Sequence, residues 1–206
     1  MNHHHSPYSP SLSLICLLGL LLCSLVGCAT TTSAPASPTE SRADRIESLE
    51  LAILEISDRI DTEEAGRAAR IAIEYPLELA ESYEIEHSPL MHNFLVNVGA
   101  KPRGLCTHWT WDLYARLQQE RFKTIDLHWG IANYQSAFRL EHSTVIISAK
   151  GDSLQQGMVL DPWRQGGPLF FAKTEEDPDY QWYPHAEIHA LKRERKALAL
   201  NRPAQR

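Results

Sequence analysis

The chain has 206 residues and carries 20 Lys and Arg against 26 Asp and Glu, a formal net charge of −6. This mildly acidic balance argues against nucleic acid or an anionic surface as the main partner. The length allows one domain with a proper core and is short for two.

The first 27 residues have the pattern of an export signal. An uncharged apolar run from Leu12 to Val26 ends in small residues just before Cys28, as in secretory signals. The run is shorter than the roughly 18 to 20 apolar residues that a membrane-spanning helix needs. We therefore favour a cleaved signal over an uncleaved membrane anchor.

Leu25-Val-Gly-Cys28 resembles the lipobox of bacterial lipoproteins. The resemblance implies that Cys28 is acylated, becomes the mature N-terminus and anchors the protein in the membrane. Ala29 at the next position implies the outer membrane, with the protein facing the periplasm. Residues 28–42 are small, polar and proline-bearing, which predicts a flexible tether. Residues 43–206 are left as a single folded domain.

The first part of this domain is predicted to be helical. From Arg45 onward, apolar residues between Ile46 and Ile60 recur at steps of three and four, which predicts an amphipathic helix with one narrow stripe. Asp61 followed by Glu64 predicts a capping box that opens a second helix. We expect this helix to be interrupted at Pro76, since proline removes a helical hydrogen bond.

Two further helices are expected before any strand. Ser88 and Pro89 predict the start of a short helix closed by Gly99. A longer helix is expected over residues 107–121. In the short helix the apolar residues Leu90, Phe94, Leu95 and Val98 share a face, and in the longer one Cys106, Trp109, Leu113 and Leu117 do.

The second half of the domain is predicted to form three or four short antiparallel strands. β-Branched and aromatic residues fall between Gly and Pro breaks, over residues 123–133, 142–148, 158–160 and 168–172. Residues 186–200 predict a basic terminal helix, more typical of a solvated helix than of a surface-binding one. The five tryptophans are expected in the core and in pocket walls.

The cysteine count singles out Cys106. Of the 4 cysteines, Cys16 and Cys23 lie within the signal and Cys28 is the expected lipidation site. Cys106 is then the only thiol of the folded domain, so it has no internal disulfide partner. A helix N-terminus lowers the pKa of a thiol, and its free amides can hold an oxyanion.

A reactive thiol needs a base within reach and a group that orients the base. His142 follows Glu141 and opens a strongly apolar strand, and Asp161 ends the next strand. If these two strands are neighbours, their ends place the imidazole between the thiol and the carboxylate.

Gly104-Leu-Cys106, His142 at a strand start and Val159-Leu-Asp161-Pro-Trp163 together resemble the transglutaminase-like branch of papain-fold cysteine enzymes, over roughly residues 90–172. The resemblance implies an α+β fold in which N-terminal helices and a Cys-bearing helix pack on a small antiparallel sheet. It implies Cys106 as nucleophile, His142 as general base and acid, and Asp161 as the orienting carboxylate. The implied activity is hydrolysis or acyl transfer at peptide or amide bonds of an envelope peptide or protein, with no cofactor and no metal.

Two features of the site stay open in the sequence. His108 lies close enough to the thiol to compete for the role of base. No side-chain oxyanion donor is evident, and Asn93, His92 or Asn97 would supply one only if the preceding helix folds back.

Two other functions remain as alternatives. The first is an inactive envelope lipoprotein that uses the fold as a binding module, with the stripe from Ile46 to Ile60 docking a partner. The second is a zinc site drawn from Cys106, His108, His128 and His142, since zinc prefers thiolate and imidazole ligands. These residues lack the short repeated spacing of zinc signatures, so this alternative ranks last.

Overall fold

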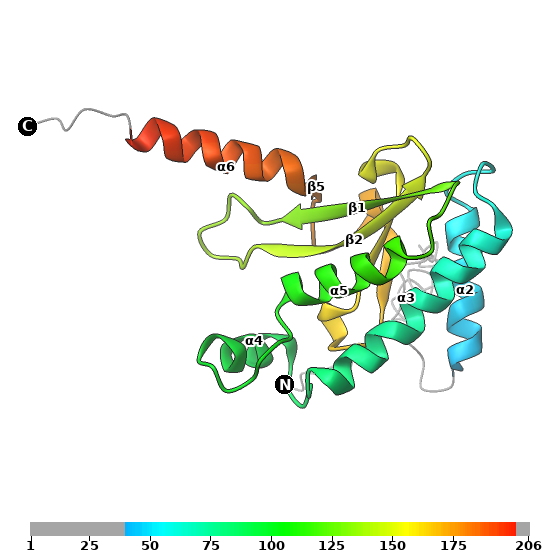
Figure 1. Ribbon diagram of the computed structural model, residues 1–206, viewed down its shortest axis with the longest axis horizontal. Coiled ribbons are helices and arrows are strands. Elements are labelled where there is room, and N and C mark those ends of the chain that lie inside the picture. The colour runs from blue at the N-terminus through cyan, green and yellow to red at the C-terminus, as the bar shows by residue number, and fades with distance from the viewer. Residues whose placement is uncertain (1–39, 201–206) are drawn as a thin grey trace, which may run out of the picture. The chain divides into compact units, whose positions relative to one another are not determined.

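Five α-helices and a five-stranded antiparallel sheet make up residues 40–200, the part of the chain that the computed structural model describes (Figure 1). The predicted α+β class is confirmed. The predicted signal, the lipidation site and most of the tether lie outside the described residues. Within residues 40–200, no helix combines the length and the apolar character needed to cross a membrane.

The helices precede the sheet, except for the last one. They are α2 (Arg42–Leu54), α3 (Thr62–Ser82), α4 (Pro89–Asn97), α5 (Cys106–Gln118) and α6 (His185–Leu200). The strands are β1 (Ile125–Ala132), β2 (His142–Ala149), β3 (Met158–Asp161), β4 (Phe170–Lys173) and β5 (Tyr183–Pro184). Their order in the sheet is β4-β3-β2-β1-β5. The two-residue β5 was not predicted, because so short a strand has no periodicity.

Helix α2 begins at Arg42, the last residue of the predicted tether. Ser41 Oγ accepts a hydrogen bond from Asp44 N at 3.1 Å, and the Asp44 carboxylate accepts one from Ser41 N at 2.9 Å. This reciprocal cap starts the helix. Leu49 and Ile53 of the apolar stripe are fully buried in the protein's own core.

Helix α3 starts as predicted but does not stop at Pro76. Asp61 Oδ1 accepts a hydrogen bond from Glu64 N at 3.0 Å at the helix start, and the helix continues to Ser82. Pro76 is buried between turns that also bury Ile73 and Leu79. Tertiary packing of these apolar residues holds the helix together where proline removes a single N–H bond.

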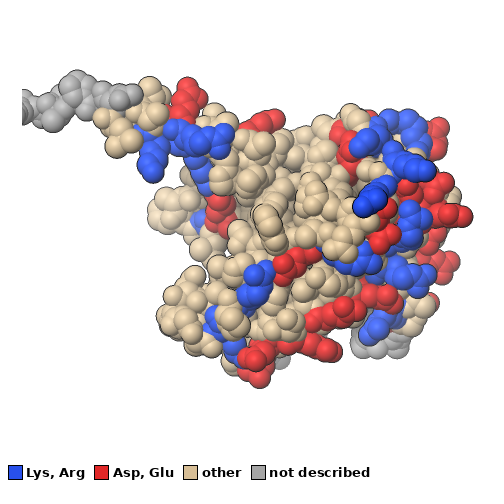
Figure 2. Space-filling model, viewed as in Figure 1, with Lys and Arg blue, Asp and Glu red and all other residues tan. Residues whose placement is uncertain are grey.

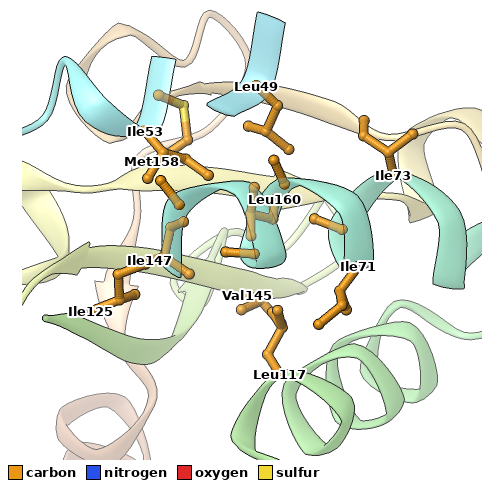
Figure 3. Close-up of a cluster of buried hydrophobic side chains, with 14 of the residues drawn as sticks. Leu49, Ile53, Ile71, Ile73, Leu117, Ile125, Val145, Ile147, Met158 and Leu160 are labelled. Carbon is orange, nitrogen blue, oxygen red and sulfur yellow. The ribbon is translucent and has the colours of Figure 1, made fainter. Parts of the chain in front are cut away.

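The main core lies between the helices and one face of the sheet. Helix α5 packs on β1 and β2, α3 packs on α5, and α2 packs on α3. Side chains from all these elements meet in one cluster (Figure 3), which includes Leu49, Ile53, Ile71, Leu117, Val145, Ile147, Met158 and Leu160. The same face of α5 buries Cys106, Trp109, Leu113 and Leu117, as the periodicity predicts.

The opposite face of the sheet is also covered. Ile146 of β2 and Val159 of β3 pack with Leu154 and Trp182, which come from the connections that follow β2 and β4. Strand β2 is therefore buried along its whole length. The start of β2 and the end of β3 lie inside the protein, where polar side chains need protein partners.

Helix α4 turns most of its apolar face outward. Leu90, Phe94 and Val98, predicted to share a face, are 62%, 58% and 58% exposed. The buried side chain of this helix is His92, whose Nε2 donates to the Arg103 carbonyl at 2.8 Å. A hydrogen bond to the loop before α5 thus decides which side of α4 faces inward.

Candidate active site

The loop that leads into Cys106 is held by side chains on both sides. Gly104 has φ +122°, and a Cβ at this position would meet the His92 ring at 2.4 Å. Trp109 Nε1 donates to the Gly104 carbonyl at 3.0 Å. Only glycine fits this backbone conformation and this approach, so the loop delivers Cys106 to a defined position.

His108 takes part in the same loop rather than in proton transfer. Its Nδ1 accepts hydrogen bonds from Gly104 N at 3.1 Å and from Leu105 N at 3.3 Å. Burial and the nearby Arg103 guanidinium hold the pKa of His108 below its usual value, which keeps the ring a neutral acceptor. We therefore assign His108 to the support of the helix start.

Cys106 is the first residue of α5 and is 9% exposed. In its thiol form, Sγ donates to the carbonyl of Glu141, the residue before His142, at 3.8 Å. Burial by itself raises the pKa of the thiol. The His142 ring and the backbone and hydroxyl of Ser143 outweigh burial and bring the pKa below its ordinary value. The protein thus favours the nucleophilic thiolate.

His142 and Asp161 form a buried pair beside the thiol. His142 Nε2 lies 2.6 Å from Asp161 Oδ2, with the two side chains 2% and 0% exposed. An ionised carboxylate only accepts hydrogen bonds, so Nε2 carries the proton. Nδ1 is buried and has no hydrogen-bond partner among the described residues. This nitrogen is left to take the thiol proton.

The charges in the pair support each other. Burial lowers the pKa of His142, but the charge of Asp161, its hydrogen bond and the interaction with Cys106 raise the pKa to about 9. Burial raises the pKa of Asp161, while His142 and Arg164 bring it below its usual range. The arrangement therefore favours a thiolate, an imidazolium and a carboxylate in series.

Aromatic rings enclose the imidazole. The ring centroids of Trp163 and Tyr180 lie 4.7 Å from that of His142, and the Trp182 centroid lies 5.5 Å away. Trp163 and Trp182 are thus walls of the site, as predicted, whereas Trp111, predicted in the core or a pocket wall, is 63% exposed. The rings around His142 exclude water from the ion pair, which strengthens its electrostatic interactions.

Helix α4 does fold back onto the site. Trp163 Nε1 donates to Asn93 Oδ1 at 3.1 Å, so the Asn93 amide has its nitrogen left as a donor. Of the other two residues considered as oxyanion donors, His92 is bonded to the preceding loop and Asn97 is exposed. Asn93 is the one with a contact to a wall of the site.

Several residues of the site were missed in the sequence. Ser143 contacts the thiol, Arg164 binds Asp161, and Tyr180 covers the imidazole. Arg164 follows Asp161 by three residues around a proline turn, a spacing that signals a local ion pair. Tyr180 has no such signal, because its contact with His142 depends on the path of a long connection.

The residues considered for zinc do not assemble. His128 Nε2 pairs with Ser148 Oγ at 2.8 Å, and His108 is bonded to backbone amides. Across residues 40–200, no group of three or more His, Cys, Asp or Glu side chains is arranged to hold a metal ion.

No family model, characterised protein or solved structure matches the chain. Fold and site together define an α+β protein with Cys106 at a helix N-terminus beside a buried His–Asp pair.

Proposed function

We propose that the protein is a transglutaminase-like cysteine hydrolase or acyltransferase that acts on peptide or amide bonds. The observation that carries the proposal is the His142–Asp161 hydrogen bond of 2.6 Å, fully buried beside the only thiol of the described residues. A cysteine nucleophile is activated by two groups: an imidazole that exchanges a proton with the thiol, and a carboxylate that fixes the tautomer of the imidazole.

The chemistry assigns one role to each residue. The Cys106 thiolate attacks the carbonyl carbon, and the first amides of α5 hold the oxyanion, with the Asn93 amide nitrogen as a further donor. The His142 imidazolium gives its proton to the amine nitrogen as the C–N bond breaks, which leaves a thioester. His142 then takes a proton from water or from an acceptor amine, which attacks the thioester and frees the thiol.

We propose a location at the cell envelope, on the basis of residues 1–28. Acylation of Cys28 would tether the domain to the outer membrane on the periplasmic side. Envelope peptides and proteins are then the substrates within reach. The proposal needs no cofactor and no metal.

The second candidate is a binding module without catalysis. The stripe from Ile46 to Ile60 no longer supports it, because Leu49 and Ile53 of this stripe lie in the core of the protein itself. Full biological function of a Cys106→Ser variant would favour the binding module over the enzyme.

The reactivity of the thiol tests the proposal. Iodoacetamide should alkylate Cys106 at pH 7 faster than it alkylates free cysteine, and His142→Ala should slow the reaction at least ten-fold, a magnitude in the range of a lost catalytic base. The rate is followed by mass spectrometry on the peptide that contains Cys106.

His128→Ala is the matched control, since this histidine lies in the same sheet and bonds Ser148 instead. It should leave the rate unchanged. A Cys106 thiol that reacts like free cysteine, and equally fast in His142→Ala, would refute the proposed function.

A further inference from the structure

Arg164 has a largely buried side chain that joins three acidic groups, Asp161, Asp177 and the more exposed Asp179. Its Nε donates to Asp161 Oδ2 at 2.7 Å, the same oxygen that His142 uses. Its two terminal nitrogens contact Asp177, with Nη1 to Oδ1 at 3.0 Å and Nη2 to Oδ2. The Arg164 side chain is 9% exposed and that of Asp177 is 0% exposed.

Asp177 in turn holds the segment that covers the imidazole. Its Oδ2 accepts a hydrogen bond from Trp182 Nε1 at 2.7 Å, and its Oδ1 accepts from the backbone of Asp179 at 3.0 Å and of Tyr180 at 3.3 Å. The Arg164 guanidinium also lies 4.5 Å from the Tyr180 ring centroid. One guanidinium therefore touches both the carboxylate and the aromatic wall of the site.

We propose that Arg164 is a positioning residue that orients Asp161 toward His142 and fastens the Tyr180–Trp182 wall through Asp177, an inference that rests on the proposed function. A planar guanidinium fork suits this task, because it makes several bonds in fixed directions. Lysine offers a single charged nitrogen and cannot reproduce both contacts. Arg164 itself touches no reacting atom and acts only through its partners.

The physical need for Arg164 follows from the charges. Asp161 is wholly buried, and a buried carboxylate needs compensation to stay ionised. His142 supplies one hydrogen bond and Arg164 the other, both to Oδ2, while Oδ1 has no partner among the described residues. Without Arg164 a single bond would hold Asp161, and the imidazole would lose a fixed acceptor.

A double-mutant cycle on the alkylation rate of Cys106 at pH 7 tests the inference. Arg164→Met should slow alkylation about ten-fold in the natural background and less than about two-fold in an Asp161→Asn background, because residues that act through one network are not additive. Arg164→Lys should recover part of the rate. Thermal unfolding of each variant shows that the assay temperature lies within the folded range.

Arg45→Met is the matched control. This arginine stacks on Phe171, which follows Phe170 in β4 but packs on the other face of the sheet, and it contacts the Leu169 carbonyl and not the site. It should leave the alkylation rate unchanged. If Arg164→Met does not fold, Arg164→Lys and Asp177→Asn replace it in the same cycle.

The outcomes separate the inference from the proposed function. Suppose that the Cys106 thiol of the natural chain is activated. If Arg164→Met then leaves its alkylation rate unchanged, or lowers the rate equally in both backgrounds, the role of Arg164 is overturned and the proposed function stands. A thiol that is not activated in the natural chain, with no effect of His142→Ala, overturns both.

Discussion

At the scale of single residues, the pKa values of Cys106 and His142 predict how reactivity depends on pH. The thiol pKa lies below its ordinary value and that of His142 is raised to about 9. As the pH rises, the thiolate forms first, and the imidazolium loses its proton only near pH 9. Between these two steps the thiolate and the imidazolium coexist, as a coupled pair.

The alkylation rate of Cys106 should therefore begin to rise at a lower pH than the alkylation rate of free cysteine. In His142→Ala the rise should move to higher pH, because burial without the imidazole raises the pKa of a thiol. The measurement is the second-order rate with iodoacetamide between pH 4 and pH 10. Equal midpoints in the two proteins would contradict the ion pair.

Asn93 gives a second prediction at this scale. Alkylation by iodoacetamide forms no oxyanion, whereas acylation by p-nitrophenyl acetate does. Asn93→Ala should leave alkylation unchanged and slow acylation of Cys106 by ten-fold or more, because a lost oxyanion donor costs catalysis alone. Asn97→Ala, on the same helix but exposed, is the control. A parallel fall in both rates would point instead to a shift of Trp163.

At the scale of elements, the start of α3 is tied to the start of β1. The Glu64 carboxylate is 6% exposed and accepts hydrogen bonds from Lys123 N and Thr124 N, each at 2.8 Å, and from Thr124 Oγ1 at 2.6 Å. The predicted capping box is thus only half formed, since Asp61 caps the helix and Glu64 turns to the strand. This contact sets where β1 enters the sheet.

Glu64→Gln should destabilise the protein by about 1 to 3 kcal/mol at pH 7, the range for hydrogen bonds to a buried charged group. Burial raises the pKa of Glu64, but these hydrogen bonds lower it below its usual value. The folded state thus binds the proton more weakly than the unfolded state, and the contribution disappears as the pH falls through the folded pKa.

Denaturant unfolding at pH 7 and pH 3 measures this effect, and the gap between the natural chain and Glu64→Gln should narrow at the lower pH. Glu63→Gln, exposed in the same helical turn, is the control and should change little at either pH. A gap that is constant with pH would show that shape and not charge decides the stability difference.

The position of the candidate site depends on where three elements begin or end. Cys106 comes from the start of α5, His142 from the start of β2 and Asp161 from the end of β3. Helix α5 packs on β2, and β2 pairs with β3 from Val145–Leu160 onward. The three residues meet because these elements terminate at the same end of the sheet.

At the scale of the whole molecule, charge is unevenly distributed. Lys, Arg, Asp and Glu crowd the side formed by α2 and α3, whereas uncharged side chains dominate the surface over β1 (Figure 2). Trp111 of α5 is 63% exposed, and its ring centroid lies 6.0 Å from the ring centroid of Trp129 in β1. The two rings form an aromatic contact where α5 packs against β1.

The predicted anchor is also a property of the whole chain. In a bacterial host, Cys28→Ser should abolish labelling with radioactive palmitate and move the protein from the membrane fraction to the soluble fraction, because a stable anchor needs acyl chains. Cys23→Ser, within the apolar run, is the control and should keep both the label and the membrane location. Palmitate labelling that survives Cys28→Ser would contradict the lipobox assignment.

The sequence alone determined the class of fold, and it indicated three residues that the structure brings together. Periodicity reports which residues of an element are buried, so the faces of α5 and the strand β2 were predictable. Cys106, His142 and Asp161 were predictable because each lies at the end of an element.

Only the tertiary structure decided the rest. Pro76 stays helical and the apolar face of α4 points outward, because contacts with distant residues outweigh local preference. Asp177 and Tyr180 come from the long connection after β4 and converge on Arg164 and His142. Contacts between residues far apart in sequence carry no local periodicity, so the support of the site became visible only in the folded chain.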